Sequence, residues 1–370
     1  MTGYPFESDK FSEDGIKLVR GMNVKRGYLD FSEDICVKWN SCVGLENYLL
    51  KDGDILIQMD GALIGKSYAK IKKNQLPALL VQRVTRARTN NKLASQDFMY
   101  QTIQRDFLRY IGMNKTETAV PHLSLNDIRN FEIMVPGLAE QNKIGTYFSN
   151  LDRLITLHQR KCDEIKSLKK YMLQKMFPQN EQKVPKIRFK GFTEAWEQRK
   201  LGEVTQCLDS ERVPINSEER KKIPGEIPYY GAGNIQGYIN KFLFDEELVL
   251  LLEDGDAFDD FRTKEIAQYI CGKTWVNNHA HVLRPLGDAY FLYITLSHKD
   301  IRNWVQLAGA SRKQLVQKSM LNIELCMPHI IEQKQIGQYF SNLDHLITLH
   351  QQKCEELKKI KKFMLQKMFV

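Results

Sequence analysis

Two histidine-cysteine pairs in the chain have the types and spacing of metal ligands. His158 with Cys162, and His350 with Cys354, form H-x3-C pairs whose members are four residues apart on a helical pattern. Together they supply the four nitrogen and sulfur ligands that zinc prefers. If the two helices cross near their midpoints, however, the cysteines lie about 8 residues, or about 12 Å, apart along the axis. One ion cannot bridge that distance, so we predict no metal site.

A glycine-rich segment, GALIGKS at residues 61–67, resembles a phosphate-binding loop. It has three residues between its glycines where the phosphate cradle needs four, and the strand-to-helix context is missing. The sequence contains neither an NPPY-like tetrad for adenine methylation nor a glycine-rich loop for S-adenosylmethionine. His279 and His281 fall on one face of an expected strand, which favours core or hydrogen-bonding roles. We therefore predict no catalytic centre and no cofactor.

The remaining chemistry is that of a surface that binds a polyanion. A formal net charge of +9 permits a nucleic-acid partner. Lys and Arg neutralise phosphates, while Arg, Asn, Gln and Ser at loop tips contact base edges. In the first half of the chain, the candidates for DNA binding are Arg20, Asn23, Lys25, Arg26, Lys70, Lys72 and Lys73. In the second half they are Tyr230, Asn234, Lys264, Ser311, Arg312, Lys313 and Gln314.

Length and composition are those of a globular protein. The 370 residues are enough for two domains, each with its own core. Seven cysteines without a C-x-x-C pair are typical of a reducing compartment. No apolar run approaches the roughly 20 residues that span a bilayer, and the N-terminus lacks a signal-peptide pattern. We therefore expect a cytoplasmic protein without membrane contact.

A repeat determines how these side chains are positioned. Phe131–Phe177 and Ile323–Phe369 align without a gap, 192 residues apart, with 30 of 47 positions identical. In both copies apolar residues recur at the alternating spacing of four and three that is typical of a helix packed on another helix. Only His158 and Lys169 interrupt this stripe in the first copy. Each copy therefore predicts a long helix of about 38 residues, or near 57 Å.

Neither helix can bury its stripe alone, so the natural partner of each is the other copy. Because two similar units tend to pair about a two-fold axis, we expect an antiparallel coiled coil with internal pseudo-two-fold symmetry. The alternative is that each helix forms an unrelated intermolecular coiled coil, as in a purely structural protein. The expected helix-pairing positions are Phe148, Leu151, Ile155, His158, Phe340, Leu343, Ile347 and His350.

Short β-rich runs, such as GDILIQMDGALIG and ELVLLLEDGD, precede each helix and are bounded by Gly, Asn and Asp. Shorter helical patterns follow, around Phe98–Ile111 and Tyr290–Leu307, so the fold class is α+β. The expected organisation is a first module at 1–139, a helix at 140–178, a linker at 179–195, a second module at 196–331 and a helix at 332–370.

The two modules share much less than the two helices. Asn23 and Asn234 lie in similar settings, and MDG at 59–61 resembles EDG at 253–255. The loop GASRKQL at 309–315 aligns with ETAVPHL at 117–123 by the constant offset, with different side chains. A chain that keeps its helices nearly identical while its modules differ is suited to recognise two different things at a fixed distance.

The chain resembles the DNA-specificity subunits of type I restriction-modification systems. The resemblance is carried by P-x(3)-EQ-x(2)-IG-x-YFSNLD-x-LITLHQ-x-K, ending in LQKMF, and by VPKIRFKGFTEAWEQRKLGEV, IPYYGAGNIQGYI and WVNNHAHVLRP. It covers essentially the whole chain. It implies a non-catalytic subunit in which two target recognition domains each read half of a bipartite site in double-stranded DNA. Two helices would set the spacing and dock two methylase subunits, with restriction and translocase subunits completing the complex.

Another class of function fits the composition as well: a free-standing DNA methylase or nuclease with an unrecognised centre. The resemblance also has one departure. Trp196 lies 38 residues before Asn234, and the equivalent of Trp196 ahead of Asn23 would fall at about position −15. The first module therefore lacks the opening segment of the second, because the start lies upstream or because the chain is a shortened variant. On this basis we expect the first recognition domain to be incompletely folded.

Overall fold

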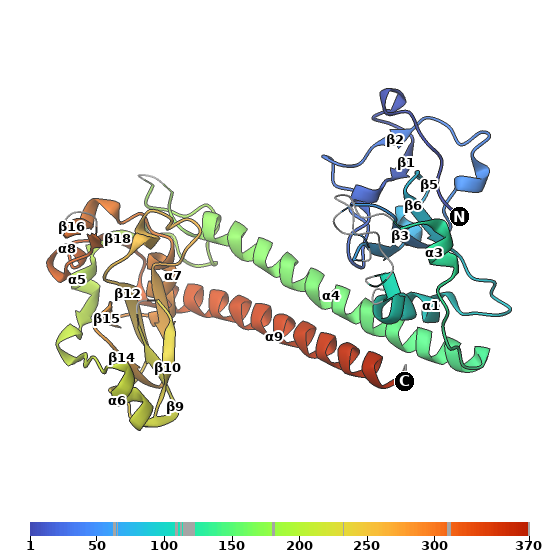
Figure 1. Ribbon diagram of the computed structural model, residues 1–370. Helices are drawn as coiled ribbons and strands as arrows, with labels where there is room; N and C mark the ends of the chain where they lie inside the picture. Colours follow the sequence, from blue (N-terminus) through green and yellow to red (C-terminus); the bar gives the residue numbers. More distant parts are fainter. Residues whose placement is uncertain are drawn as a thin grey trace. The chain divides into compact units, whose positions relative to one another are not determined.

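The computed structural model describes residues 1–61, 64, 66–107, 110–111, 113, 123–179, 182–231, 233–308 and 312–368. The chain divides into two compact units, Met1–Gln159 with Gln352–Val370, and Arg160–Gln351. We call them unit 1 and unit 2. Each contains one β-rich module and part of each of two long helices, α4 and α9 (Figure 1).

Unit 1 contains two three-stranded sheets. The first has the order β2-β1-β5, with β1 antiparallel to β2 and parallel to β5. The second has the order β4-β3-β6 and is antiparallel. The strands are β1 (Ile16–Val19), β2 (Lys38–Trp39), β3 (Ile55–Gln58), β4 (Tyr68–Lys70), β5 (Ala78–Leu80) and β6 (Val84–Ala87). The short helices are α1 (Gln96–Thr102), which continues as a π-helical turn (Ile103–Phe107), and α3 (Leu125–Arg129).

Unit 2 contains two four-stranded sheets and two strand pairs, in the orders β10-β9-β14-β11, β13-β12-β15-β8, β16-β17 and β18-β7. Its strands are β7 (Glu197–Lys200), β8 (Thr205–Cys207), β9 (Pro224–Tyr230), β10 (Ile235–Ile239), β11 (Phe244–Asp245), β12 (Leu248–Leu252), β13 (Ala267–Ile270), β14 (Lys273–Val276), β15 (Ala280–Pro285), β16 (Gln306–Ala308), β17 (Arg312–Gln314) and β18 (Glu324–Met327). Its short helices are α5 (Leu201–Val204), α6 (Ser217–Lys222), α7 (Ala289–Ser297) and α8 (Gln317–Met320).

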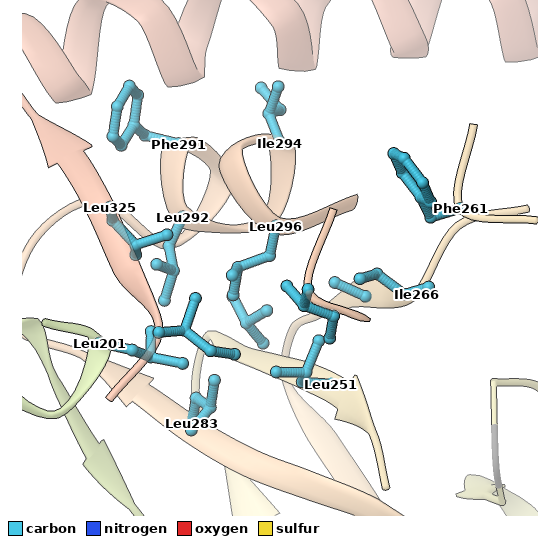
Figure 2. Close-up of a cluster of buried hydrophobic side chains, with 14 of the residues drawn as sticks. Leu201, Leu251, Phe261, Ile266, Leu283, Phe291, Leu292, Ile294, Leu296 and Leu325 are labelled. Carbon is cyan, nitrogen blue, oxygen red and sulfur yellow. The ribbon is translucent and has the colours of Figure 1, made fainter. Parts of the chain in front are cut away.

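The two modules have the same arrangement, and the α+β prediction is confirmed. A central antiparallel strand, β3 or β12, lies between two neighbours, and a second sheet contains one parallel strand pair. Every residue of β12 is buried, because its alternate side chains belong to two apolar clusters, Val249 and Leu251 to one and Leu248 and Leu250 to the other. In Figure 2, Leu292 and Leu296 of α7 point toward Leu251 and Leu283 of the sheet. Phe291 points to the other side of α7, where its ring stacks on Phe177 at 5.7 Å between centroids.

The helices α4 (Leu138–Met176) and α9 (Ile330–Met368) are 39 residues each and pack antiparallel in both units. In unit 1, Lys361 forms an ion pair with Asp152 at 2.6 Å. In unit 2, Lys169 forms one with Asp344 at 2.7 Å. These are the same two positions of the 192-residue repeat, so Lys169 interrupts the apolar stripe because it pairs across the helices.

The predicted pairing positions are buried to different degrees. Phe148, Leu151, Phe340, Leu343 and Ile347 are buried. Ile155, His158 and His350 are half-buried. Cys162 and Cys354 are buried too, and the Cys354 thiol lies 3.9 Å from the carbonyl oxygen of Ile155. Within the described residues, no group of three or more His, Cys, Asp or Glu side chains has the geometry of a metal site. No helix among them is long and apolar enough to cross a membrane.

The segment between α4 and β7, predicted as a linker, packs against unit 2. Its Ile187 amide donates to the carbonyl oxygen of Lys175 at 2.9 Å. Arg188 forms a double hydrogen bond with Glu332, and Trp196 is 1% exposed. Ile187, Phe189 and Trp196 of this segment pack into the apolar core of unit 2, and Arg188 is largely buried beside them, so these contacts hold the segment in place.

Unit 1 has a core of its own, which corrects the expectation of an incompletely folded module. Three clusters of buried apolar side chains fill it, around Leu56, Ile57 and Leu79. The core forms because β3, β4, β5 and β6 bury their apolar faces against one another and against α1. Unit 1 has fewer strands than unit 2, and one of the differences is at residues 132–135, which lie outside any strand, whereas the equivalent residues of unit 2 form β18.

Candidate nucleic-acid interface

Four segments of unit 2 meet at one edge of its sheets. They are the loop after β9 (231–234), the loop after β12 (253–265), the turn between β14 and β15 (277–279) and the β16-β17 hairpin. The Glu253 amide donates to the carbonyl oxygen of His279 at 3.3 Å, and the Leu315 amide donates to that of Glu253 at 2.8 Å. The Asn277 amide donates to the carbonyl oxygen of Tyr230 at 3.0 Å. Backbone bonds therefore hold all four together.

Unit 1 has an equivalent frame of backbone hydrogen bonds, formed by a different sequence. The Met59 amide donates to the carbonyl oxygen of Arg83 at 2.9 Å, and the Leu123 amide donates to that of Met59 at 2.8 Å. Leu123 lies 192 residues before Leu315, so the predicted alignment of the two loops holds at their common end. Residues 114–122, which contain most of the ETAVPHL segment, lie outside the described residues, as do three residues of GALIGKS.

The side chains on this shared frame differ between the units. In unit 1, Arg83 forms an ion pair with Asp60 at 2.7 Å, and the arginine side chain is 70% exposed. Arg83 also has a φ of 72°, a left-handed conformation that costs energy in residues other than glycine. In unit 2 the equivalent pair is His279 and Asp254, 3.3 Å apart. We did not predict Arg83 from the sequence. The likeness of MDG at 59–61 to EDG at 253–255 indicated only the segment that contains Asp60, the partner of Arg83.

A buried polar network lies inside unit 2 next to the interface edge and holds its loops. The His281 Nε2 atom donates to the carbonyl oxygen of Leu315 at 2.6 Å, and its Nδ1 atom is hydrogen-bonded to Asp209 at 2.5 Å. Arg212 donates to Glu253 at 2.7 Å and lies 3.5 Å from Asp209. The predicted hydrogen-bonding role of His281 is confirmed. This network fixes the base of the hairpin and of the loop after β12.

The carboxylate of Asp209 is kept charged by this network. Burial alone would raise its pKa, but the bonds from His281 and the Val282 amide and the charge of Arg212 hold the pKa of Asp209 below its usual range. Such a group stabilises the folded state above its unfolded pKa of about 3.9 and loses that contribution as the pH falls through the lower folded value.

Replacing Asp209 by asparagine should lower the free energy of unfolding of unit 2 by about 3 kcal/mol at neutral pH, because it removes the buried negative charge that accepts from His281 and the Val282 amide and lies beside Arg212. The difference from the unchanged chain should shrink as the pH falls through the lowered pKa of Asp209. Denaturant unfolding at several pH values measures it. As a control, Asp300→Asn removes a carboxylate whose ion pair with Arg302 is exposed, and should cost less than about 0.5 kcal/mol.

The structure separates the predicted residues of unit 2. Asn234 is exposed at the tip of its loop, and Tyr230 is half-buried beside it, where burial raises the pKa of its phenol. Lys313 is paired with Asp259, and the Gln314 amide donates to Glu253 at 3.3 Å. Lys264 forms an exposed ion pair with Asp260. Arg312 belongs to β17, and Ser311 lies outside the described residues.

In unit 1 the predicted residues have more varied positions. Asn23 is completely buried, and its side chain is bonded to the backbone of Arg20, Asp30 and Ile35. Arg20 donates to the carbonyl oxygen of Ile35, so both residues shape the loop from inside. Three cations are exposed and two are half-buried, with Lys70 paired to Asp97. The exposed ones are Arg26, Lys72 and Lys73, and the half-buried ones are Lys25 and Lys70.

A cavity of about 430 Å³ opens beside the turn that carries His279. Its lining includes Tyr229, Gln236 and Asn277, and Arg220 lies over the Tyr229 ring at 4.5 Å. Amide, imidazole and guanidinium groups next to an aromatic face are the groups that bind the edges and faces of nucleobases.

The family model described as the type I restriction modification DNA specificity domain matches the chain twice, at residues 4–167 and 193–359. The chain belongs to the family of type I restriction-modification specificity subunits. Among its relatives, the MjaVIII specificity subunit of Methanocaldococcus jannaschii is 22% identical over 97% of this chain and 83% of the relative. A putative specificity subunit of Haemophilus influenzae is 34% identical over 41% of this chain and only 38% of its own length.

The fold comparison agrees with membership of the specificity-subunit family. The crystal structure of a type I restriction-modification S subunit from M. genitalium superposes with a TM-score of 0.71, at 16% sequence identity. The match covers 100% of this chain and 93% of that one. At this identity the likeness shows a shared fold, with two modules and two long helices, while the residues at the interface edge are this chain's own.

Proposed function

We propose that this specificity subunit binds double-stranded DNA through the interface edges of both units, each of which reads one half of a bipartite site. The proposal rests on the repeated backbone hydrogen bonds at the interface edge. Met59 in unit 1 and Glu253 in unit 2 make equivalent bonds, while the side chains at the equivalent positions Arg83 and His279 differ. A common scaffold with unlike side chains is what reading two different half-sites requires. The chain would act without a catalytic centre of its own.

Exposed cations near the edges would supply the phosphate contacts. Arg26 is exposed in unit 1 and forms a bridge with Tyr68 of β4, and Arg262 is exposed in the loop after β12. Lys72 and Lys73 are exposed too, but they lie beside the start of β3, at the other end of that sheet. Methyl transfer, translocation and cleavage would then belong to partner subunits. Two methylase subunits and the restriction subunits of the family are the partners that we propose for the complex.

Salt dependence tests the DNA-binding proposal. The logarithm of the affinity for DNA should fall linearly with the logarithm of salt concentration, by roughly 0.9 for each phosphate contact. Arg262→Ala, in the loop after β12, should reduce this slope by about 0.9 without changing which sequence is preferred. The matched control is Lys358→Ala, on α9 and paired with Glu355 on the same helix. Affinity that is indifferent to salt would contradict the proposal.

Single substitutions on the shared frame should alter one half-site each. Arg83→Ala should relax the sequence preference of the half-site that unit 1 reads, and His279→Ala that of unit 2, by about 1–3 kcal/mol of discrimination. Selection of bound molecules from a randomised DNA pool measures both preferences. A uniform loss of affinity with unchanged preferences would assign these side chains to the phosphate backbone instead.

A further inference from the structure

The same four residue types recur on one face of each long helix. Their spacing of i, i+4, i+7 and i+11 places four residues in a row along a helix. On α4 the row consists of Gln141, Gly145, Phe148 and Asp152, and on α9 it consists of Gln333, Gly337, Phe340 and Asp344. We call these two rows the joint faces. The module helix α1 lies on the first in unit 1, and α7 lies on the second in unit 2 (Figure 1).

The glycine of each joint face lets the module helix touch the backbone of the long helix. A Cβ atom at Gly145 would lie 2.7 Å from the amide nitrogen of Phe98, in the first turn of α1. A Cβ atom at Gly337 would overlap the carboxylate of Asp288, which caps α7 by accepting from the Phe291 amide. Both contacts are much closer than the ordinary separation of about 3.5–4.0 Å between nonbonded carbon atoms. The start of each module helix therefore rests on a glycine.

The glutamine and the phenylalanine of each joint face also contact the module helix. The side chains of Gln141 and Gln333 accept from backbone amides at the start of α1 and of α7. Phe148 and Phe340 are completely buried and share apolar clusters with residues of α1 and of α7. Three kinds of contact thus follow one another along each joint face before its aspartate.

The aspartate of each joint face joins three helices. In unit 2, Asp344 of α9 accepts from the Tyr290 hydroxyl of α7 at 2.6 Å and from Lys169 of α4 at 2.7 Å. Burial and the nearby carboxylate raise the pKa of Tyr290, so the hydroxyl retains the proton that it donates.

In unit 1 the equivalent aspartate has a different set of donors. Asp152 of α4 accepts from Gln101 of α1 at 3.3 Å and from Lys361 of α9 at 2.6 Å. Lys361 also donates to Gln104, in the turn that continues α1, at 2.8 Å. Phe98 occupies the position of Tyr290 and has no hydroxyl. Both units therefore connect three helices at this position, with different side chains from the module helix.

We propose that the joint faces fix the orientation of each module on the long helices and thereby set how many base pairs separate the two half-sites. The inference rests on the DNA binding proposed above. The glycine and the aspartate of a joint face lie seven residues, or about 10 Å, apart, and two such attachments prevent the module helix from pivoting. Since successive base pairs lie about 3.4 Å apart, a small tilt at a joint face moves an interface edge toward another base pair.

Spacer selectivity of the full chain tests the joint faces. Duplexes carry both selected half-sites and differ only in the spacer, the base pairs between them, and competition gives their relative affinities. Tyr290→Phe removes the bond to Asp344 and retains the ring. The preference for the best spacer over one that is a base pair longer or shorter should fall roughly fivefold, the equivalent of one hydrogen bond, with both half-site sequences unchanged.

A rescue and a matched control separate positioning from a loss of structure. Gly337→Ala should shift the preferred spacer, and Asp288→Gly in the same chain should restore it, because it removes the carboxylate that the new Cβ atom meets and glycine is a tolerated N-cap. Tyr293→Phe is the control, since its hydroxyl donates to Glu265 within the module, at 3.2 Å. Its spacer preference should match that of the unchanged chain.

Circular dichroism of each variant checks that it remains folded. Spacer preferences of Tyr290→Phe and Gly337→Ala that match those of the unchanged chain would overturn the role of the joint faces. An equal loss of preference in Tyr293→Phe would overturn it too, because the effect would then arise inside the module. An unchanged chain that binds DNA without preferring any spacer would instead contradict the bipartite reading itself.

Discussion

Replacing Glu332 by alanine should lower the free energy of unfolding of unit 2 by about 3–5 kcal/mol. The substitution leaves the guanidinium of Arg188, whose side chain is 12% exposed, buried without its counter-charge. It also loosens the segment that carries Trp196, since this ion pair attaches it to α9 alongside the β7-β18 pairing and the packing of Trp196. Denaturant unfolding followed by hydrogen exchange at the β7-β18 pair measures the loss.

The repeat itself offers the matched control. Glu140 occupies the equivalent position in unit 1 and is exposed, so Glu140→Ala should change the stability by less than about 0.5 kcal/mol. The two substitutions remove the same group from the same position of nearly identical helices. Losses of equal size in the two variants would mean that the ion pair with Arg188 contributes nothing and that the cost arises within the helix.

Exchanging the module of unit 2 should replace one half-site and leave the other unchanged. The structure sets the boundaries at Thr205 and Asn322, because Trp196 and β18 share a core cluster with residues of α9, and β7 pairs with β18, so all three should stay with the helices. A module from another family member with a different target then carries the interface edge of that member into the chimera. Selection from a randomised DNA pool, for the parent and the chimera, gives both half-sites.

A chimera in which both half-sites change would contradict independent reading by the two units. The reverse exchange, in unit 1, is the symmetrical control and should alter the other half-site. Unfolding of the unchanged unit at its original denaturant concentration confirms that the exchange did not disturb it. Salt dependence should change only by the difference in cations between the two modules.

The sequence predicted the helices well because their signal is local and periodic. Phe148 and Phe340 recur at the same place of a long repeat, and both are completely buried. The pairing of the two helices followed from the impossibility of burying either stripe alone, and its antiparallel direction followed from the tendency of two similar units to pair about a two-fold axis. Lys169 looked like a fault in the stripe because its partner, Asp344, is 175 residues away and spacing alone does not reveal it.

The interface was harder to predict, since residue type does not determine which way a loop side chain points. Asn23 and Asn234 have similar neighbours, yet one is buried and bonded to backbone while the other is exposed. The fate of Asn23 depends on Asp30 and Ile35, which meet it only after the chain has folded. Arg83 was missed for the same reason, because its turn joins the edge through the backbone of Met59.

The attachment of the β16-β17 hairpin has a consequence for how such a protein changes over generations. The hairpin is tied to the sheet at its base, by the Leu315 amide and the Glu253 carbonyl group, and Leu315 is fully buried there. Leu307, nearer the tip, is 69% exposed and adds little to the core. Mutations in the hairpin nearer the tip than Leu315 can therefore accumulate without unfolding the unit. Selection can then act on sequence specificity through these residues, while selection for stability acts on the buried residues of the sheets.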